Sequence, residues 1–384
     1  MEYWLWLSEL KGIGPILEKR LLAYFKTPKA IYEAEQEELM LIEGVGSNLA
    51  KTIRQSRALE NALKSLELIN KSKIKILTIH DKLYAKCAQK YDLAPVVLYY
   101  QGTIREKIDG VTIVGARKCS SYAKQVAVEA ATYLAKEDVP VISGMAKGID
   151  SYAHTACVKA GGYTIAFLGH GLDMCYPKEH KALMENIKES GAVISEYPLG
   201  VKPQKAYFPR RNALMSSWSQ KVLVVEAAEK SGALITAKIA KQQGKEVLVP
   251  PHEIYYESAR GTNLLISEGA TLYLNPSQLM NTEKKRKSSE TKDLEKQPKI
   301  KKVLNKEFGS PTEYKKIEIE DNMVQIYNKI LNCLDSSSMN IEELEKNTSI
   351  KQVELIGYLA EMELEGVIEG IAGGKFRRKT AYQG

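Results

Sequence analysis

The sequence predicts an α/β fold built on a mainly parallel sheet, with an all-helical domain before the sheet and a small helix-and-wing domain after it. From residue 111 onward, short apolar strand patterns alternate with amphipathic helical patterns, which is typical of a parallel sheet with right-handed crossovers. Before residue 67 the apolar residues recur at helical spacing. After residue 320, helical patterns are followed by two short strand patterns.

The composition predicts a multidomain protein of the cytoplasm. A chain of 384 residues with 44% hydrophobic residues is expected to form two to four globular domains. The formal charge of +8 suggests an acidic partner, although residues 283–307 alone hold ten Lys and Arg against five Asp and Glu. The five cysteines form no C-x-x-C pair, so we expect neither a metal site nor disulfides. The apolar start is too short for a signal or spanning helix, so we expect no membrane partner.

Residues 1–66 are expected to form a helix-hairpin-helix domain of the SAM-like kind. Two glycine hairpins of the same form, Gly12-Ile13-Gly14 and Gly44-Val45-Gly46, start 32 residues apart. Glycine lets such a turn close tightly, and the amides at the start of the next helix can hold a DNA phosphate. A packing module whose glycines only form turns explains the repeat equally well.

Residues 67–280 are expected to form the sheet domain. The expected strands are 74–79, 96–100, 111–114, 139–143, 164–168, 192–195, 222–226 and 246–249. The expected helices are 121–136, 149–160, 179–190, 213–218, 233–243 and 263–268. The first two strands are expected to extend the edge of the sheet. Ligands of such sheets bind at the carboxyl ends of the strands.

The rest of the chain is expected to form a linker and a third domain. Residues 281–320 are rich in Lys, Glu, Ser and Thr, the composition of a flexible linker, and 284–287 is a basic run. Residues 321–384 have the order of a winged helix, with helices at 324–334, 341–348 and 351–365 and a wing turned at Gly373-Gly374. The third helix is acidic, so a protein contact explains it at least as well as DNA does.

Two glycine turns follow expected strands and have phosphate-binding chemistry. The candidate residues are Gly115, Arg117 and Lys118 in the first turn, and Ser143, Gly144, Lys147 and Gly148 in the second. Glycine permits a tight turn into a helix whose first amides face an anion, and an arginine can clamp that anion bidentately. Asp150 is placed to cap the helix after the second turn.

Two further stretches are expected at the same edge. Residues 207–212 are predicted to form a loop between a strand and a helix, and no Asp or Glu occurs from 197 to 225 to neutralise its cations. Its candidate residues are Arg210, Arg211 and Asn212, while Tyr207 or Phe208 can stack a base or pack in the core. The last stretch contains Ser231 and Gly232, which open a helix with free amides.

The sequence offers little that favours catalysis. It contains no complete G-x-G-x-x-G fingerprint and no Walker A motif, so NAD binding and nucleotide-driven motors are disfavoured. The spacing of the histidines and acids shows no catalytic triad or carboxylate pair, and we expect no cofactor. For Glu226 and Glu229, the acids nearest the expected site, a structural role such as helix capping or orienting an arginine is predicted.

These motifs together resemble the DprA/Smf family, DNA processing protein A of bacterial transformation, over most of the chain. The resemblance rests on the following stretches: 113–117, 143–150, 208–212, 224–227, 231–237, 260–263, Leu265-Ile266 and Gly269-Ala270. The sequence departs from the family pattern at Ala116, where Ser is usual, at Met145, where a second Gly is usual, and at Lys147, where Arg is usual. The region after Asn212 departs as well.

The resemblance implies an extended Rossmann-like core, single-stranded-DNA binding and delivery of that DNA to a RecA-type recombinase, without catalysis. It implies DNA contacts by Arg117 and Arg210, and a homodimer through the late core near Asn263 to Glu268. One alternative is a Rossmann-type hydrolase of nucleotide N-glycosidic bonds, acting on nucleoside monophosphates. That enzyme needs a P-G-G-x-G-T-x-x-E run, and residues 231–237 contain neither its glycines nor its acid. A second alternative is an interaction scaffold that recruits proteins through its terminal domains.

Overall fold

The computed structural model describes residues 1–280, 326–334, 337–352, 355, 358–359, 362, 367–371 and 375–378. The chain divides into two compact units, Met1–Glu295 and Lys296–Gly384, and each is treated by itself. The predicted linker 281–320, including the basic run 284–287, lies outside the described residues. Among the described residues, no helix has the length and apolar character needed to cross a bilayer.

The first unit begins with a helical domain that has two glycine turns of the same geometry. Its helices are α1 (Glu2–Ser8), α2 (Pro15–Phe25), α3 (Pro28–Glu33), α4 (Gln36–Leu39), α5 (Ser47–Gln55) and α6 (Glu60–Asn70). Gly12 has φ 80° and Gly44 has φ 92°, a left-handed conformation that favours glycine. Two residues later, Gly14 and Gly46 are the N-cap residues of α2 and α5. The predicted hairpins are therefore confirmed as turns that start helices.

The second part of this unit is built on a mixed sheet that is parallel over most of its width. Within residues 1–280 the sheet has nine strands in the order β1-β2-β6-β5-β4-β3-β7-β8-β9. From β6 to β9 all neighbours pair in parallel, whereas β1 and β2 pair antiparallel at one edge. The strands are β1 (Lys75–Thr78), β2 (Val97–Gly102), β3 (Gly110–Val114), β4 (Val141–Ser143), β5 (Thr164–Leu168), β6 (Ala192–Ser195), β7 (Ser219–Val224), β8 (Glu246–Val249) and β9 (Thr271–Leu272).

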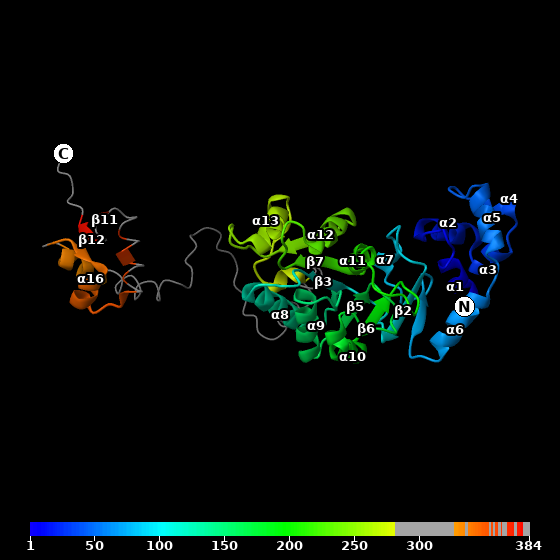
Figure 1. Ribbon diagram of the computed structural model, residues 1–384, viewed down its shortest axis with the longest axis horizontal. Helices are drawn as coiled ribbons and strands as arrows, with labels where there is room; N and C mark the ends of the chain where they lie inside the picture. The colour runs from blue at the N-terminus through cyan, green and yellow to red at the C-terminus, as the bar shows by residue number, and fades with distance from the viewer. Residues whose placement is uncertain are drawn as a thin grey trace, which may run out of the picture. The chain divides into compact units, whose positions relative to one another are not determined.

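Helices cover both faces of this sheet, as the sequence pattern predicts (Figure 1). Alternate residues of β7 point to opposite faces: Leu223 joins the apolar cluster under α8 and α9, whereas Val222 and Val224 join the cluster under α11 and α12. The helical elements are α7 (Lys86–Gln89), α8 (Ser121–Lys136), α9 (Ile149–Lys159), η1 (Lys178–His180), α10 (Lys181–Ser190), α11 (Tyr207–Ser217), α12 (Gly232–Gln242), η2 (Glu257–Ala259), α13 (Arg260–Ser267) and η3 (Pro276–Leu279).

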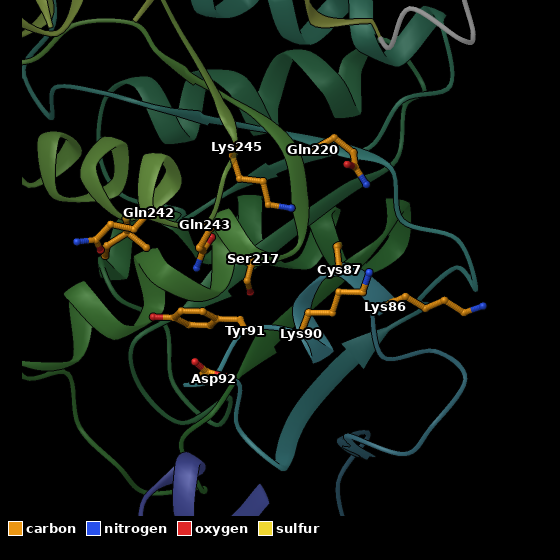
Figure 2. Close-up of a pocket in the computed structure, with 11 residues that line it drawn as sticks. Lys86, Cys87, Lys90, Tyr91, Asp92, Ser217, Gln220, Gln242, Gln243 and Lys245 are labelled. Atoms are coloured by element: carbon orange, nitrogen blue, oxygen red, sulfur yellow. The ribbon is translucent and has the colours of Figure 1, made fainter. Parts of the chain in front are cut away.

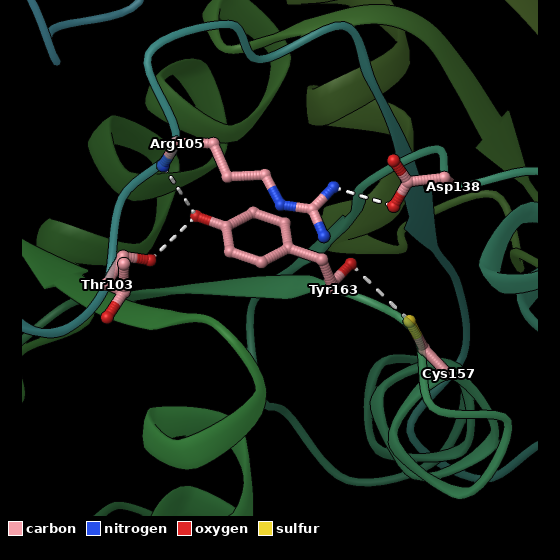
Figure 3. A network of polar contacts seen from close by, with 5 residues as sticks. All are labelled: Thr103, Arg105, Asp138, Cys157 and Tyr163. Carbon is pink, nitrogen blue, oxygen red and sulfur yellow. Dashed lines mark hydrogen bonds and ion pairs between the residues drawn. The ribbon is translucent and has the colours of Figure 1, made fainter.

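A polar network fastens the connection between β2 and β3 to the loops at the amino ends of β4 and β5 (Figure 3). The Tyr163 hydroxyl donates to Thr103 O at 2.8 Å and accepts from the Arg105 amide at 3.3 Å. The Arg105 guanidinium lies 4.3 Å from the centre of the Tyr163 ring and donates to Asp138 Oδ1 at 2.8 Å. Burial raises the pKa of Tyr163 to about 12. The hydroxyl therefore keeps the proton that it donates to Thr103 O at physiological pH.

The prediction of a loop at 207–212 is wrong, because these residues form the first half of α11. Pro209 is the third residue of that helix. The first helical residues have no intrahelical partner for their amides, so a proline costs no hydrogen bond there. The predicted short helix 213–218 is therefore the second half of a longer one.

In the second unit, the described residues include a three-stranded sheet in the order β10-β12-β11. Its elements are β10 (Met339–Asn340), α16 (Ile341–Thr348), β11 (Ile368–Ile371) and β12 (Lys375–Arg378), and residues 326–334 are also helical. The two strands of the expected wing pair antiparallel. Most of the expected third helix, 351–365, and the Gly373-Gly374 turn lie outside the described residues. The winged helix therefore stays a prediction.

Candidate nucleic-acid interface

The chain reverses its winding direction between β3 and β7, and a cavity of about 300 Å³ lies at the carboxyl ends of these strands. From β3 the chain adds β4, β5 and β6 on one side, then crosses back to place β7 on the other side of β3. Open α/β sheets form their ligand crevices at such a reversal, because the loops after the two central strands diverge there. The cavity is lined by Val114, Gly115, Arg117, Ala146, Asp150, Phe208, Arg211, Asn212, Met215, Ser231, Gly232, Ala233 and Thr236.

Arg211 is the buried cation of this cavity. Its guanidinium donates to Phe167 O at 2.9 Å and to Gly144 O, and its Nε donates to Asn212 Oδ1 at 3.0 Å. These carbonyls follow or end β4 and β5, so the side chain ties α11 to the carboxyl edge of the sheet. Burial lowers the pKa of Arg211 and nearby Asp150 opposes that shift. An arginine stays charged in proteins, so the cavity wall carries a fixed positive charge.

Arg117 supplies a second, exposed cation at the same cavity. Its guanidinium carbon lies 5.9 Å from the centre of the Phe208 ring, and that of Arg211 lies 5.7 Å from the same ring. The half-buried Phe208 ring thus lies close to two guanidinium groups. Two cations close to one aromatic ring are favourable contacts, because the face of the ring carries a partial negative charge.

The start of α12 forms the facing wall. Ser231 is the N-cap residue and its hydroxyl accepts a hydrogen bond from the Ala233 amide at 3.3 Å. Asn212 donates from Nδ2 to Gly232 O at 3.4 Å, which joins α11 to α12. One turn further, Thr236 is fully buried, and its hydroxyl has no hydrogen-bond partner among the described residues. The positive end of a helix dipole favours an anion, and a buried hydroxyl without a partner favours a ligand that bonds to it.

The glycine turn after β4 packs against the Arg211 guanidinium and against the backbone at residues 116 and 117. A side chain at Gly144 would overlap the Arg211 guanidinium, and one at Gly148 would overlap the backbone at Ala116 and Arg117. Gly148 has φ 79° and is the N-cap residue of α9. The prediction that Asp150 caps this helix is wrong, since Asp150 is its second residue and accepts a hydrogen bond from the Gly144 amide at 3.1 Å. The carboxylate therefore fixes the turn.

One departure from the family pattern, Met145 in place of a glycine, lies in the same turn. Met145 has φ 56°, a left-handed conformation that glycine adopts more easily than methionine does. The Met145 side chain is fully buried, and its carbonyl accepts a hydrogen bond from His180 Nδ1 at 2.9 Å. The backbone shape is therefore that of a glycine position, held here by packing.

Arg210 points to a different environment from Arg211. Its guanidinium lies 2.8 Å from Glu196 Oε2, and the Glu196 side chain is only 5% exposed. The expectation that the cations of this stretch have no local acid is therefore wrong for Arg210, because its partner is the residue just before the acid-free window. Glu18 of α2 is also buried nearby, and burial raises its pKa to about 8, with Arg210 opposing the shift and Glu196 adding to it.

The cavity brings together half of the predicted site residues. Gly115, Arg117, Arg211, Asn212, Ser231 and Gly232 line it. Lys118 is exposed beside it, Lys147 pairs with Glu179, and Ser143 is buried with its hydroxyl donating to Ile113 O at 2.6 Å. Sequence reasoning missed Ala146, Met215 and Thr236. Ala146 lies within the motif 143–150 and Thr236 lies within 231–237, so both had a signal in the sequence. The burial of the Thr236 hydroxyl without a partner could not be read from the sequence.

Glu226 has the structural role that the sequence predicts. It is fully buried, and its carboxylate accepts hydrogen bonds from the Ser120 amide at 3.1 Å and the Ser120 hydroxyl at 2.5 Å. Ser120 is the N-cap residue of α8, so the acid after β7 stabilises the start of the helix after β3.

Two family comparisons match separate parts of the chain. Residues 75–284, more than half of the chain, match the family described as DNA recombination-mediator protein A. Residues 7–57 match the SAM-like helix-hairpin-helix tandem, in agreement with the two glycine turns. Protein Smf of Synechocystis is 37% identical over 283 residues, which cover 72% of this chain and 71% of that relative.

Two solved structures have a similar fold. DNA processing protein A (DprA) of Streptococcus pneumoniae aligns with a TM-score of 0.64 and 30% identity, over 72% of this chain and 96% of that one. DprA of Helicobacter pylori, whose structure was determined for its binding of single-stranded DNA, aligns with a TM-score of 0.51 and 29% identity, over 56% of this chain and 97% of that one. The chain belongs to the DNA recombination-mediator protein A family, the DprA/Smf family that its motifs resemble.

Proposed function

We propose that this protein is a recombination mediator that binds single-stranded DNA at the cavity on the carboxyl edge of its sheet. The observation that carries the proposal is the pair of guanidinium groups, one buried and one exposed, that both lie close to the centre of the Phe208 ring (5.7 and 5.9 Å). Arginine matches phosphate bidentately, and the start of α12 faces the same space. Among the described residues, the only acid that lines the cavity is Asp150, which is buried and bonded to the Gly144 amide.

Single-stranded DNA suits this geometry better than a duplex does. A cavity of about 300 Å³ has the size of a small-ligand site, so it accepts a phosphate with part of a nucleotide and excludes a double helix. Phe208 supplies an aromatic surface beside the cations, the combination that holds single strands without reading their sequence. The relative from Helicobacter pylori binds single-stranded DNA, which supports the same ligand here.

Delivery of the strand to a RecA-type recombinase, in natural transformation or homologous recombination, is the second part of the proposal. It rests on membership of the recombination-mediator family.

We also propose a homodimer through α13 and its neighbours. Leu264 on α13 is 49% exposed, Ile254 is 72% exposed and Tyr255 is 86% exposed. The Asn263 side chain fastens the 252–256 segment to α13 by donating to His252 O at 3.1 Å. An apolar surface of this kind favours association with a second copy.

Catalysis has no support at this site, and a role as an enzyme is not part of the proposal. The alternative activity, hydrolysis of a nucleotide N-glycosidic bond, needs a carboxylate free to act in the cavity. The Glu226 carboxylate accepts a hydrogen bond from Ser120 at the start of α8, and the Asp150 carboxylate accepts one from the Gly144 amide. Assays for release of free base from nucleoside monophosphates would detect that activity directly.

The test is binding of the full chain to labelled oligo-dT and to a duplex of equal length, measured by fluorescence anisotropy at several salt concentrations. We expect tighter binding of the single strand, with an affinity that falls as salt rises because phosphate contacts release counterions. Equal or tighter binding of the duplex would overturn the proposed ligand.

A further inference from the structure

A second cavity lies at the amino ends of the strands, opposite the first cavity at their carboxyl ends. Its volume is about 610 Å³, which is within the range of sites for small organic ligands. It lies beside the amino ends of β7 and β8, because Gln220 is the second residue of β7 and Lys245 directly precedes β8. The lining residues are Lys86, Cys87, Lys90, Tyr91, Asp92, Ser217, Gln220, Ile239, Gln242, Gln243 and Lys245. We call this the amino-edge cavity.

The amino-edge cavity is basic, because three lysines and one acid line it. Lys86, Lys90 and Lys245 line it, and none of the three has an ion pair among the residues that the structure describes. Within residues 1–280, Asp92 is the only acid that lines it. Lys86 and Lys90 belong to α7 and the residue after it, whereas Lys245 approaches from the turn before β8, on the facing side (Figure 2). Cations that face each other across a cavity favour a multivalent anion between them.

The remaining lining side chains suit a nucleobase. Tyr91 offers an aromatic ring that is half-buried, and its ring lies below Gln243 in Figure 2. Gln220, Gln242 and Gln243 offer amide groups, and a buried oxygen of Gln243 has no hydrogen-bond partner among the described residues. Aromatic rings stack on bases, and amides both donate to and accept from base edges. Lysines then hold the phosphate as point charges.

We propose that the amino-edge cavity is a second binding site, for a nucleoside phosphate, with Lys90 and Lys245 on the phosphate and Tyr91 on the base. The ligand is either a free nucleotide or one nucleotide of a DNA strand. In the second case the strand also occupies the carboxyl-edge site, by which we mean the cavity at the carboxyl ends of β3 and β7. The two sites are distinct, because the six residues of β7 separate them, a length of about 20 Å at about 3.3 Å per residue.

The test uses the full chain and the double variant Lys90→Ala/Lys245→Ala. Binding of dTMP and ATP is measured by isothermal titration calorimetry, and binding of oligo-dT of about 6 and about 30 nucleotides by anisotropy, lengths that bracket usual single-strand site sizes. The matched control is Lys64→Ala/Lys159→Ala, which removes two exposed lysines from α6 and α9 and changes the net charge equally. Circular dichroism checks that both variants fold.

If a free nucleotide is the ligand, the Lys90/Lys245 variant loses at least about tenfold in affinity for dTMP or ATP, while the Lys64/Lys159 control variant binds them as the wild type does. If a strand is the ligand, the variant weakens only the longer oligo-dT and lowers its salt dependence, by about 0.7 for each phosphate that the variant no longer binds. The proposal is overturned if the Lys90/Lys245 variant binds both kinds of ligand as the control variant does. Binding of short oligo-dT by Arg117→Ala tests the carboxyl-edge site separately. Failure of the amino-edge proposal is therefore distinguished from failure of the carboxyl-edge site.

Discussion

Arg210 and Glu196 form an ion pair in which the carboxylate is almost fully buried and the guanidinium is half exposed, with 2.8 Å between Arg210 Nη2 and Glu196 Oε2. The pair lies where α11 starts and where β6 has just ended. The positive charge that the sequence assigns to DNA binding is thus partly neutralised at this position. Arg117 has no such ion pair among the described residues, so the two arginines are expected to behave differently.

Glu196→Gln is expected to strengthen binding of oligo-dT by about twofold to fivefold, since it leaves Arg210 with its full charge, and a partly exposed ion pair is worth about 0.5 to 1 kcal/mol. Arg210→Ala is expected to weaken binding slightly and to lower stability, because it leaves a buried carboxylate unpaired. Anisotropy titrations and urea unfolding of both variants check this. Weaker binding by Glu196→Gln would show that Arg210 does not act through its charge.

Stability is expected to fall with the deprotonation of Glu18 between about pH 4.5 and about pH 8. The pKa of Glu18 is about 8 in the folded protein, because burial disfavours the charged form, and 4.5 is its ordinary value. Between these values the folded state holds a proton that the unfolded state has lost, so the free energy of unfolding falls as pH rises. Glu18→Gln removes this loss and should stabilise the protein by roughly 4 kcal/mol near pH 8.5.

The check for Glu18 is urea unfolding of the wild type and Glu18→Gln at about pH 5 and about pH 8.5. The two proteins should have similar stability at the lower pH and should diverge at the higher one. A constant difference at both pH values would contradict the assigned pKa, because it would reflect packing alone.

Gly144→Ala is expected to destabilise the protein by about 2 kcal/mol or more, in the range of overpacked cores. The added methyl group would overlap the Arg211 guanidinium, which is buried and bonded to two carbonyls and so has little room to move. Oligo-dT binding should weaken in parallel. Gly232→Ala is the matched control for stability, since a side chain at Gly232 meets no atom within 4 Å. Equal stability of the two variants in urea would contradict the packing at Arg211.

Thr236→Val is expected to separate stability from binding. The Thr236 hydroxyl is buried without a partner among the described residues, so replacing it by a methyl group of similar size should leave stability unchanged or slightly increased. If the hydroxyl bonds to the ligand, binding of oligo-dT should weaken by about 1 kcal/mol, roughly fivefold. Unfolding in urea and anisotropy measure the two effects. A loss of stability without a change in binding would remove Thr236 from the site.

Much of the fold could be predicted from the sequence because the strands are buried on both faces and flanked by amphipathic helices. The strand β3 and the helix α8 begin within one residue of their predicted positions. The prediction fails at residues 207–212 because Pro209 favours a loop in most contexts, whereas the first turn of a helix tolerates proline.

The site could be predicted only in part, because its charges are set by contacts distant in sequence. The acid-free window around Arg210 indicated an unneutralised cation, but its partner Glu196 is brought to it by folding. Arg211 was predicted as a DNA contact in a loop. Its partners are carbonyls at residues 144 and 167, which no spacing within the motif could reveal, and they hold it in the wall of the cavity.

The most direct measurement of the central claim is the affinity of Arg117→Ala for short oligo-dT, compared with Lys159→Ala, which removes one exposed lysine from the end of α9. Removal of a charge-assisted phosphate contact should cost about 1 to 3 kcal/mol, roughly fivefold to 150-fold in affinity. The Lys159 variant should bind as the wild type does. If both variants retain wild-type affinity, the cavity between β3 and β7 does not hold the DNA.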